Sequence, residues 1–492
     1  KTRVGVSAAV AVGIFDSEAE VIVGKKLQDV EGGEYIDAAG VSIDAETVTR
    51  VISEVSYPWK TAPVELAKNL IGSDGKVKGG TVSDTLSFMD GTLGIQSNLF
   101  NSWTTSTASE EAGGTALAGT VTYLGFNNDS VTTIGSEAKI NQGEVRRVKN
   151  DQTVSVQSNV LMQQFNLGGI FSFDLNAVGS EKGWDKITSI YDPTPNKAGK
   201  GAFGGSLLII DMDNVSEAVV EEDCQIYSSI NNGFNVTAET RLLNFALVQS
   251  GSSGGDWGIG ASINLNFIDS RTEALVKSGA VITGGALAID AIDETMQISW
   301  AGGLVKSESM GIGASVSIND ITRKTIARLG QDLSEEDNGK TVKVENIAHV
   351  SALSTGSLHA FSLAAAVQSS RPAENSEDSD SFGLGVSGAV GINMVDTETE
   401  ALIVGLDDSA NTAGSGDIAV TSLDDTYMFS LVGAVALMLP SSEGGKAGLA
   451  GAFAMNSLDG HVKSEILRST INREKLAVQS HRSGKIRSIT AG

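Results

Sequence analysis

A short strand-like motif returns along the whole chain, and this repeat constrains the fold more than any other feature. Residues 258–266 read Gly-Ile-Gly-Ala-Ser-Ile-Asn-Leu-Asn, and residues 311–319 read Gly-Ile-Gly-Ala-Ser-Val-Ser-Ile-Asn. Related versions occupy 4–13, 383–393 and 449–456. Each alternates apolar residues with small or polar ones at a period of two, which is the pattern of a β-strand. Internal repeats of this kind indicate a solenoid.

The last residue of each copy serves as an anchor that gives the repeat a register. The seven anchors are Gly13, Phe126, Ile210, Asn266, Asn319, Asn393 and Asn456. An aspartate follows six of them at a distance of three residues, and a small or aliphatic residue follows all seven at a distance of eight. Aspartate stabilises turns through its own backbone. The sequence therefore predicts a strand, a polar turn containing aspartate, and a second strand.

Two further alternating segments complete each repeat. The third reads Leu-Ala-Ile-Asp-Ala at 287–291, and the fourth reads Phe-Ser-Leu-Val-Gly at 429–433. The tightest anchor spacing is about 53 residues, between Asn266 and Asn319. We expect an all-β fold, a parallel β-helix (β-solenoid) of about seven two-coil repeats, with segments one and two in one coil and three and four in the next. At about 4.8 Å per coil, about 17 coils give a rod about 80 Å long.

The expected inward positions come from the third segment of each repeat. They are Ile43, Val156, Val236, Ile289, Val344, Val420 and Val478. Both ends of the stack are expected to be exposed coil edges. The alternative fold is a row of antiparallel β-sandwich domains, although the two-residue hairpin turns that these need are sparse.

The chain divides into three parts. Residues 1–50 form the first repeat, 51–111 form an insertion, and 112–492 continue the solenoid, with repeats truncated at both ends of the chain. Within the insertion, Pro63 and Gly72 bound a short helical pattern. A second helical face is indicated by Leu86, Met89, Leu93, Phe100 and Trp103. We expect a partly helical block on the solenoid side. An acidic, solvated loop is expected at 371–381.

Charge and cysteine content exclude several classes of protein. The formal net charge is −25, which disfavours nucleic acid and anionic membrane surfaces as partners. The single cysteine, Cys224, rules out an intrachain disulfide. No apolar run of about 18 residues predicts a transmembrane helix. The chain starts at Lys1 without a signal-peptide pattern, and we expect it to be an internal piece of a longer protein.

The repeat resembles that of large filamentous adhesins, the fusobacterial leukotoxin family and its relatives. The residues that carry the resemblance are Gly-x-Gly-Ala-Ser-Val-Ser-Ile-Asn, an alanine eight residues later, and the Val-x-Val-x-Ala segment. Phe-Asn-Ser-Trp at 100–103 is also similar to segments of that family. The resemblance covers most of the chain and implies a very long secreted protein at a bacterial cell surface, acting in attachment or virulence.

The partners that this implies are a host or bacterial surface receptor, protein or glycan, together with flanking repeats of the same chain. Self-association into fibres is a further possibility. No family catalytic residues carry over. Two other functions stay open, a β-helical polysaccharide lyase or hydrolase and an inert spacer or matrix fibre.

No catalytic constellation stands out. The histidines are scattered without the spacing of metal ligands; they are His349, His359, His461 and His481. Cys224 follows Glu-Glu-Asp, and acidic neighbours raise the pKa of a thiol, so we expect a buried or inert cysteine.

Carboxylates are the remaining candidates for chemistry. Asp211 and Asp213 share one face of an extended chain, and Glu335, Glu336 and Asp337 cluster in a loop. A glycosidase needs two carboxyl groups about 5–9 Å apart in a sugar-binding cleft, and aromatic residues that would line one make up only 5% of the chain. We therefore expect no catalytic site and no cofactor. Stacked aspartates could still bind calcium, and the candidates are Asp211, Asp213, Asp269, Asp396 and Asp459.

Overall fold

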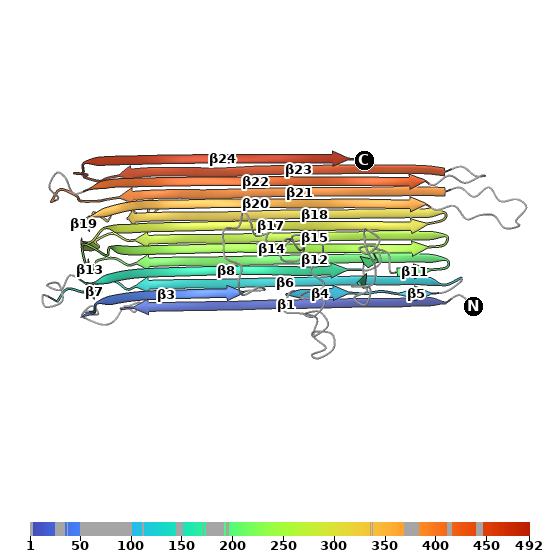
Figure 1. Cartoon of the computed structure of the whole chain (residues 1–492), viewed down its shortest axis with the longest axis horizontal. Coiled ribbons are helices and arrows are strands. Elements are labelled where there is room, and N and C mark those ends of the chain that lie inside the picture. The colour runs from blue at the N-terminus through green and yellow to red at the C-terminus, as the bar shows by residue number, and fades with distance from the viewer. Residues whose placement is uncertain are drawn as a thin grey trace, which may run out of the picture.

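The computed structural model shows two long parallel β-sheets that face each other and a short third sheet that joins them at one end (Figure 1). The structure describes residues 3–24, 35–36, 38–49, 101–110, 113–143, 151–170, 172–173, 191–192, 196–334, 336, 338–368, 383–410, 416–438 and 446–492. None of these residues is helical.

The first sheet contains one long strand from each coil. Its strands, in spatial order, are β1 (Val4–Val23), β6 (Thr115–Ile134), β12 (Gly201–Val220), β15 (Trp257–Val276), β18 (Met310–Gly330), β21 (Gly383–Val404) and β23 (Lys446–Leu467). Neighbouring strands pair in parallel along their whole length.

The second sheet lies opposite, and its strands run in the reverse direction (Figure 1). It contains β3 (Gly40–Thr49), β4 (Ser102–Thr105), β5 (Ser109–Glu110), β8 (Thr153–Gly169), β11 (Asn196–Ala198), β14 (Phe234–Gly254), β17 (Leu287–Ser307), β20 (Ile347–Gln368), β22 (Asp417–Met438) and β24 (Lys475–Ala491).

A corner sheet lies between the two long sheets, and its five strands each connect one of the first five first-sheet strands to the second-sheet strand that follows it. It contains β2 (Tyr35–Ile36), β7 (Lys139–Ile140), β13 (Gln225–Ser228), β16 (Val281–Gly284) and β19 (Lys343–Val344). A separate antiparallel pair is formed by β9 (Ser172–Phe173) and β10 (Tyr191–Asp192).

The predicted parallel β-solenoid is confirmed, and the β-sandwich alternative is wrong. The division of each repeat into two coils is also wrong, because one repeat makes one coil. Segments one and two join into a single strand of 20 to 22 residues, and Asp269 lies inside β15 instead of in a turn. Inward Ile268 and Ser270 flank it, so the period of two continues through the aspartate without a break.

The predicted rod about 80 Å long is wrong for the same reason. Seven first-sheet strands about 4.8 Å apart span only roughly 30 Å, whereas a strand of about 20 residues is roughly 65 Å long. The described part of the molecule is thus longest along its strands (Figure 1).

Two registers differ from the prediction. Leu124, and not Phe126, pairs with Gly13 and Ile210, so the predicted register of the second repeat is wrong by two residues. A shift of two residues keeps every side chain on its face, so alternation alone could not reveal it. In the fifth repeat, Val350 and not Val344 pairs with Ile289, because Val344 lies in the corner sheet, where it pairs with Ile282.

Six of the seven predicted inward residues are buried, namely Ile43, Val156, Val236, Ile289, Val344 and Val420. Val344 is buried in the corner strand β19 and not in the second sheet. The prediction is wrong for Val478, which is 42% exposed because β24 lies at the edge of its sheet and has β22 on one side only.

The insertion interrupts one strand of the second sheet. Thr49 of β3 pairs with Met162 of β8, and Ser102 of β4 pairs with Asn166 of the same strand. Residues 102–110 therefore belong to the solenoid, and Trp103 lies in a strand and not on a helical face. The predicted helical segments in 51–100, the acidic loop at 371–381, and Glu335 and Asp337 lie outside the described residues.

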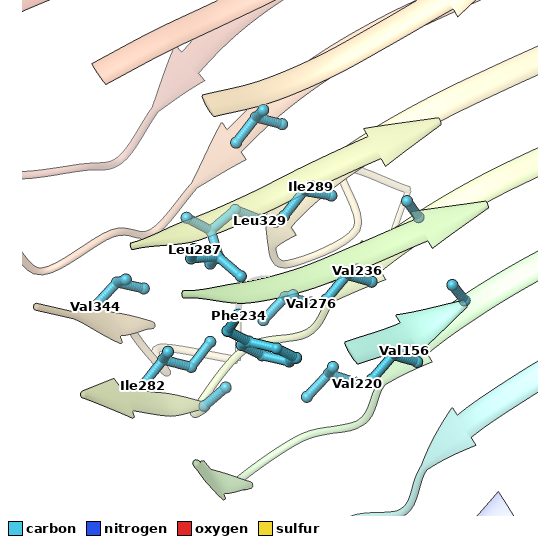
Figure 2. Close-up of a cluster of buried hydrophobic side chains, with 14 of the residues drawn as sticks. Val156, Val220, Phe234, Val236, Val276, Ile282, Leu287, Ile289, Leu329 and Val344 are labelled. Carbon is cyan, nitrogen blue, oxygen red and sulfur yellow. The ribbon is translucent and has the colours of Figure 1, made fainter. Parts of the chain in front are cut away.

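The side chains that fill the interior differ between the two ends of the strands. Beside the corner sheet it is filled by large aliphatic side chains and Phe234 (Figure 2). At the opposite end it is lined by glycine, alanine and serine, and the two sheets come close together. A Cβ on Gly313 of β18 would lie 2.7 Å from the carbonyl oxygen of Ala365 in β20, so only glycine fits there.

An asparagine ladder crosses the interior between these regions. The Nδ2 atom of Asn266 donates to Oδ1 of Asn319 at 2.9 Å, Asn319 donates to Asn393 at 2.7 Å, and Asn393 donates to Asn456 at 2.8 Å. These are four of the anchors of the repeat. The ladder supplies partners for the inward amide oxygens of Asn319, Asn393 and Asn456.

A buried arginine joins the two sheets next to the ladder. Arg323 of β18 is 1% exposed and lies between the fully buried Asp293 of β17 and Asp424 of β22. Its Nη1 atom is 3.3 Å from Oδ1 of Asp293, and its Nη2 atom donates to Oγ1 of Thr426 at 2.6 Å. Gly356 leaves room for the guanidinium, because a Cβ there would lie 2.7 Å from Nη1.

The Arg323→Met substitution is expected to lower the free energy of unfolding by about 3–5 kcal/mol, because it removes the cation beside the fully buried Asp293 and leaves Arg482, 3.4 Å away, as the cation beside Asp424. Burial already raises the pKa of Asp293, and Arg323 opposes that rise. Lys324→Met, one residue along on the outer face, is the matched control and should change stability by about 0.5 kcal/mol or less. Urea unfolding measures both, and equal losses would contradict the proposed role of the ion network.

Candidate interaction surface

The first sheet carries its large apolar residues on the outside over the first half of each strand. In β18, Gly311, Gly313, Ser315, Ser317 and Asn319 point inward, and the residues between them point outward. This is the reverse of the usual arrangement, in which the apolar face of a sheet packs on the core.

In-register pairing stacks the outward residues into columns that cross all seven strands. Every member of the columns through Ile312, Val316 and Ile318 is aliphatic, aromatic or methionine. The central column consists of Val10, Val121, Leu207, Ile263, Val316, Val390 and Phe453. We call these three columns the aliphatic outer face. Ile263 in the middle of the sheet is 38% exposed, and Val10 and Phe453 at its edges are 72% and 56% exposed.

A strip of small residues runs between the columns of Ile312 and Val316. It consists of Ala8, Gly119, Gly205, Ala261, Ala314, Gly388 and Gly451. A Cβ added at Gly388 or Gly451 would meet no atom within 4 Å. The aliphatic outer face therefore has ridges of side chains with an open strip between them.

The second half of the same face carries mostly carboxylates, and we call it the acidic outer half. Its first column is Asp16, Asn127, Asp213, Asp269, Thr322, Asp396 and Asp459. Burial raises the pKa of Asp269, and the neighbouring Asp213 raises it further. Arg271 offsets part of the repulsion by pairing with Glu217 and with Glu273.

The calcium candidates lie in this half but do not converge. Asp213 pairs with Asp269, and Asp396 pairs with Asp459, while Thr322 separates the two pairs. Asp211 faces outward like Asp213, with Phe267 beside it. In the described part of the chain, no group of three or more His, Cys, Asp or Glu side chains could hold a metal ion.

The second sheet has an aromatic outer face at the same end of the molecule as the aliphatic one. Trp300 and Phe361 have ring centroids 5.6 Å apart, and Phe361 and Phe429 have centroids 5.7 Å apart. On earlier coils Phe165 stacks on Phe245 with centroids 5.6 Å apart. Phe165 is only 8% exposed, so we call Trp300, Phe361 and Phe429 the aromatic outer face. Both outer faces are thus apolar at the end away from the corner sheet.

Neither face was predicted from the sequence, although the signal was present. In Gly-Ile-Gly-Ala-Ser-Val-Ser-Ile-Asn the glycines and serines occupy every second position, which marks a thin interior as readily as a surface. The prediction of inward valine and isoleucine holds only for the half of each strand beside the corner sheet.

The remaining candidates lie apart from these faces. Cys224 is fully buried, its Sγ atom donates to the Gly135 carbonyl oxygen at 3.1 Å, and burial raises its pKa to about 12. His461 is near Glu400 at 3.7 Å, and His481 is exposed on β24. Among the described residues, no helix is long and apolar enough to cross a membrane.

The pKa values of two histidines on the outer side of the second sheet are shifted in opposite directions. A hydrogen bond to Asp290 at 3.0 Å raises the pKa of His349, while burial lowers the pKa of His359. The His349–Asp290 pair should stabilise the fold below about pH 6.5 and lose that effect as pH rises through the raised pKa. NMR titration should show His349 deprotonating at higher pH than His359. The opposite order would contradict the contact with Asp290.

Comparisons of the chain with protein-family models, curated proteins and solved structures found no match. The resemblance to filamentous adhesins therefore rests on the residues of the repeat, and any role of the outer faces rests on their geometry.

Proposed function

We propose that the chain is a structural and adhesive segment of a long secreted bacterial surface protein, which attaches to host cells, matrix or other bacteria. The observation that carries this proposal is the repetition of one outer-surface pattern on successive coils of a solenoid. Each added coil would extend the same surface, and long solenoids use such extended surfaces for binding. The resemblance of the repeat to filamentous adhesins supports the secreted, surface-exposed location.

The aromatic outer face is the part best suited to attachment. Tryptophan and tyrosine are strongly enriched among the residues that dominate binding energy, and aromatic residues in general are enriched in interfaces. Trp300, Phe361 and Phe429 form an unbroken row across three neighbouring strands, β17, β20 and β22. This row would present rigid rings to a protein or glycan receptor at little cost in side-chain entropy.

The area available also fits an interaction surface. Soluble monomers rarely expose continuous apolar patches larger than a few hundred Å². The aliphatic outer face alone covers roughly 800 Å², because its three columns span seven residues of about 3.3 Å each on seven strands about 4.8 Å apart. Regular apolar surface of this extent supports a role in binding.

Beads coated with the chain should attach to cultured epithelial cells, to matrix-coated surfaces or to bacteria. Replacing both Trp300 and Phe361 with alanine should reduce attachment at least about tenfold, because hot-spot aromatic residues each contribute about 2 kcal/mol or more. Ile318→Ala, on the aliphatic outer face, is the matched control and should leave attachment unchanged.

Circular dichroism checks that both variants keep their strands. If the unchanged chain attaches to none of the three surfaces, the adhesive role is wrong, and the alternative function of an inert spacer is favoured. If the double variant attaches as well as the unchanged chain, the aromatic outer face is not the attachment site.

A further inference from the structure

The aliphatic outer face lies on the opposite sheet from the aromatic row. Its side chains are mostly β-branched or aliphatic, and those at the sheet edges are the most exposed, with Val6 70% and Leu449 63% exposed. Sheets of this kind pack on other sheets about 10 Å away, with the side chains of the two faces interdigitating.

We propose that a second copy of this chain covers the aliphatic outer face. The two solenoids are related by a twofold axis parallel to the direction in which coils stack. The strands of the two copies then run antiparallel across the interface, while the two stacks run in the same direction. This inference goes beyond the proposed attachment function, and it concerns the other sheet.

The area of the face is sufficient for a stable pair. Specific interfaces bury about 800 Å² on each partner, and the aliphatic outer face offers roughly the same area. Each further coil would add roughly 110 Å², from about 4.8 Å along the stack and about 23 Å along the strands. Pairing would therefore strengthen with the number of coils.

The distribution of charge selects the orientation. The acidic outer half begins at the column of Thr322, six residues beyond Val316 on the same face of β18. A twofold axis along the strands would place the two acidic halves opposite each other, which costs energy in a chain of net charge −25. An axis along the stack, passing between the strip of Ala314 and the column of Val316, overlays the two apolar halves and carries the acidic halves to opposite sides.

The shape of the face favours a second stack of strands over a lipid surface. Within each ridge the side chains repeat at the spacing of the strands, and the ridges of a second copy repeat at the same spacing and can enter the open strip at Gly388 and Gly451. A bilayer would also have to accommodate the acidic outer half, which lies in the same plane as the apolar half.

Sedimentation equilibrium of the full chain at micromolar concentration should show a dimer. Val316→Glu and, as a second variant on a neighbouring strand, Ile263→Glu should each raise the dissociation constant at least about tenfold. Thr322→Glu is the matched control, since it places the same charge on the same face of β18, and it should keep the dimer. A monomeric unchanged chain would overturn the proposal. Association that survives Val316→Glu would also overturn it, because edge strands and not this face would then be joined.

The orientation is tested by a spin label on Thr322→Cys. Cys224 is buried, so it should stay unlabelled. The proposed pair separates the labels by roughly 46 Å, twice the seven residues from the axis at about 3.3 Å each. A distance of about 10–20 Å would show parallel strands and overturn the orientation.

Flotation with phosphatidylcholine vesicles tests the competing occupant. The unchanged chain should stay dimeric and should not float. If the unchanged chain is a monomer that binds vesicles, and if Val316→Glu abolishes this binding, then a lipid surface and not a second copy covers the aliphatic outer face. Val316→Glu should still attach to cells through the aromatic outer face, so failure of pairing and failure of adhesion are separate results.

Discussion

In-register parallel pairing is the constraint on which the rest of this structure depends. It places each residue directly beside its equivalent in the coils above and below. A column can therefore hold the same residue type on successive strands only if like side chains can pack or form hydrogen bonds about 4.8 Å apart. Valine and isoleucine satisfy this by packing, and asparagine satisfies it because one amide both donates and accepts, as in the ladder from Asn266 to Asn456. Like charges do not satisfy it: the pKa of Asp269 is raised by burial and raised further by the neighbouring Asp213.

The same constraint explains why charge inside the solenoid is arranged across the sheets. Asp293 and Asp424 belong to second-sheet strands that are not direct neighbours, and β20 between them carries Ser354 at the equivalent position. Arg323 enters from the first sheet and lies between the two carboxylates. A column of three aspartates would be untenable here, whereas two aspartates separated by a serine and bridged from the opposite wall are paired.

The sequence was sufficient for the solenoid, the parallel pairing, the number of repeats and most inward residues beside the corner sheet. It did not reveal that one repeat makes a single coil, because a strand of 20 residues that contains an outward aspartate has the same pattern as two short strands joined by a turn. It was insufficient for the register of the second repeat, since pairing Leu124 or Phe126 with the anchor column leaves the same face inward. The outer faces do not follow from the sequence, because alternation shows that the two faces of a strand differ but not which of them points inward.

The two halves of each strand together determine which set faces outward. Beside the corner sheet, Ile268 and Val276 of β15 point inward and need a wide interior. Because the strand continues without a bulge, their phase dictates that Ser262, Asn264 and Asn266 also point inward and that Ile259, Ile263 and Leu265 point outward. A shift of one residue would reverse both halves at once and expose the main core. The apolar outer face is therefore held in place by the aliphatic core at the other end of the same strands.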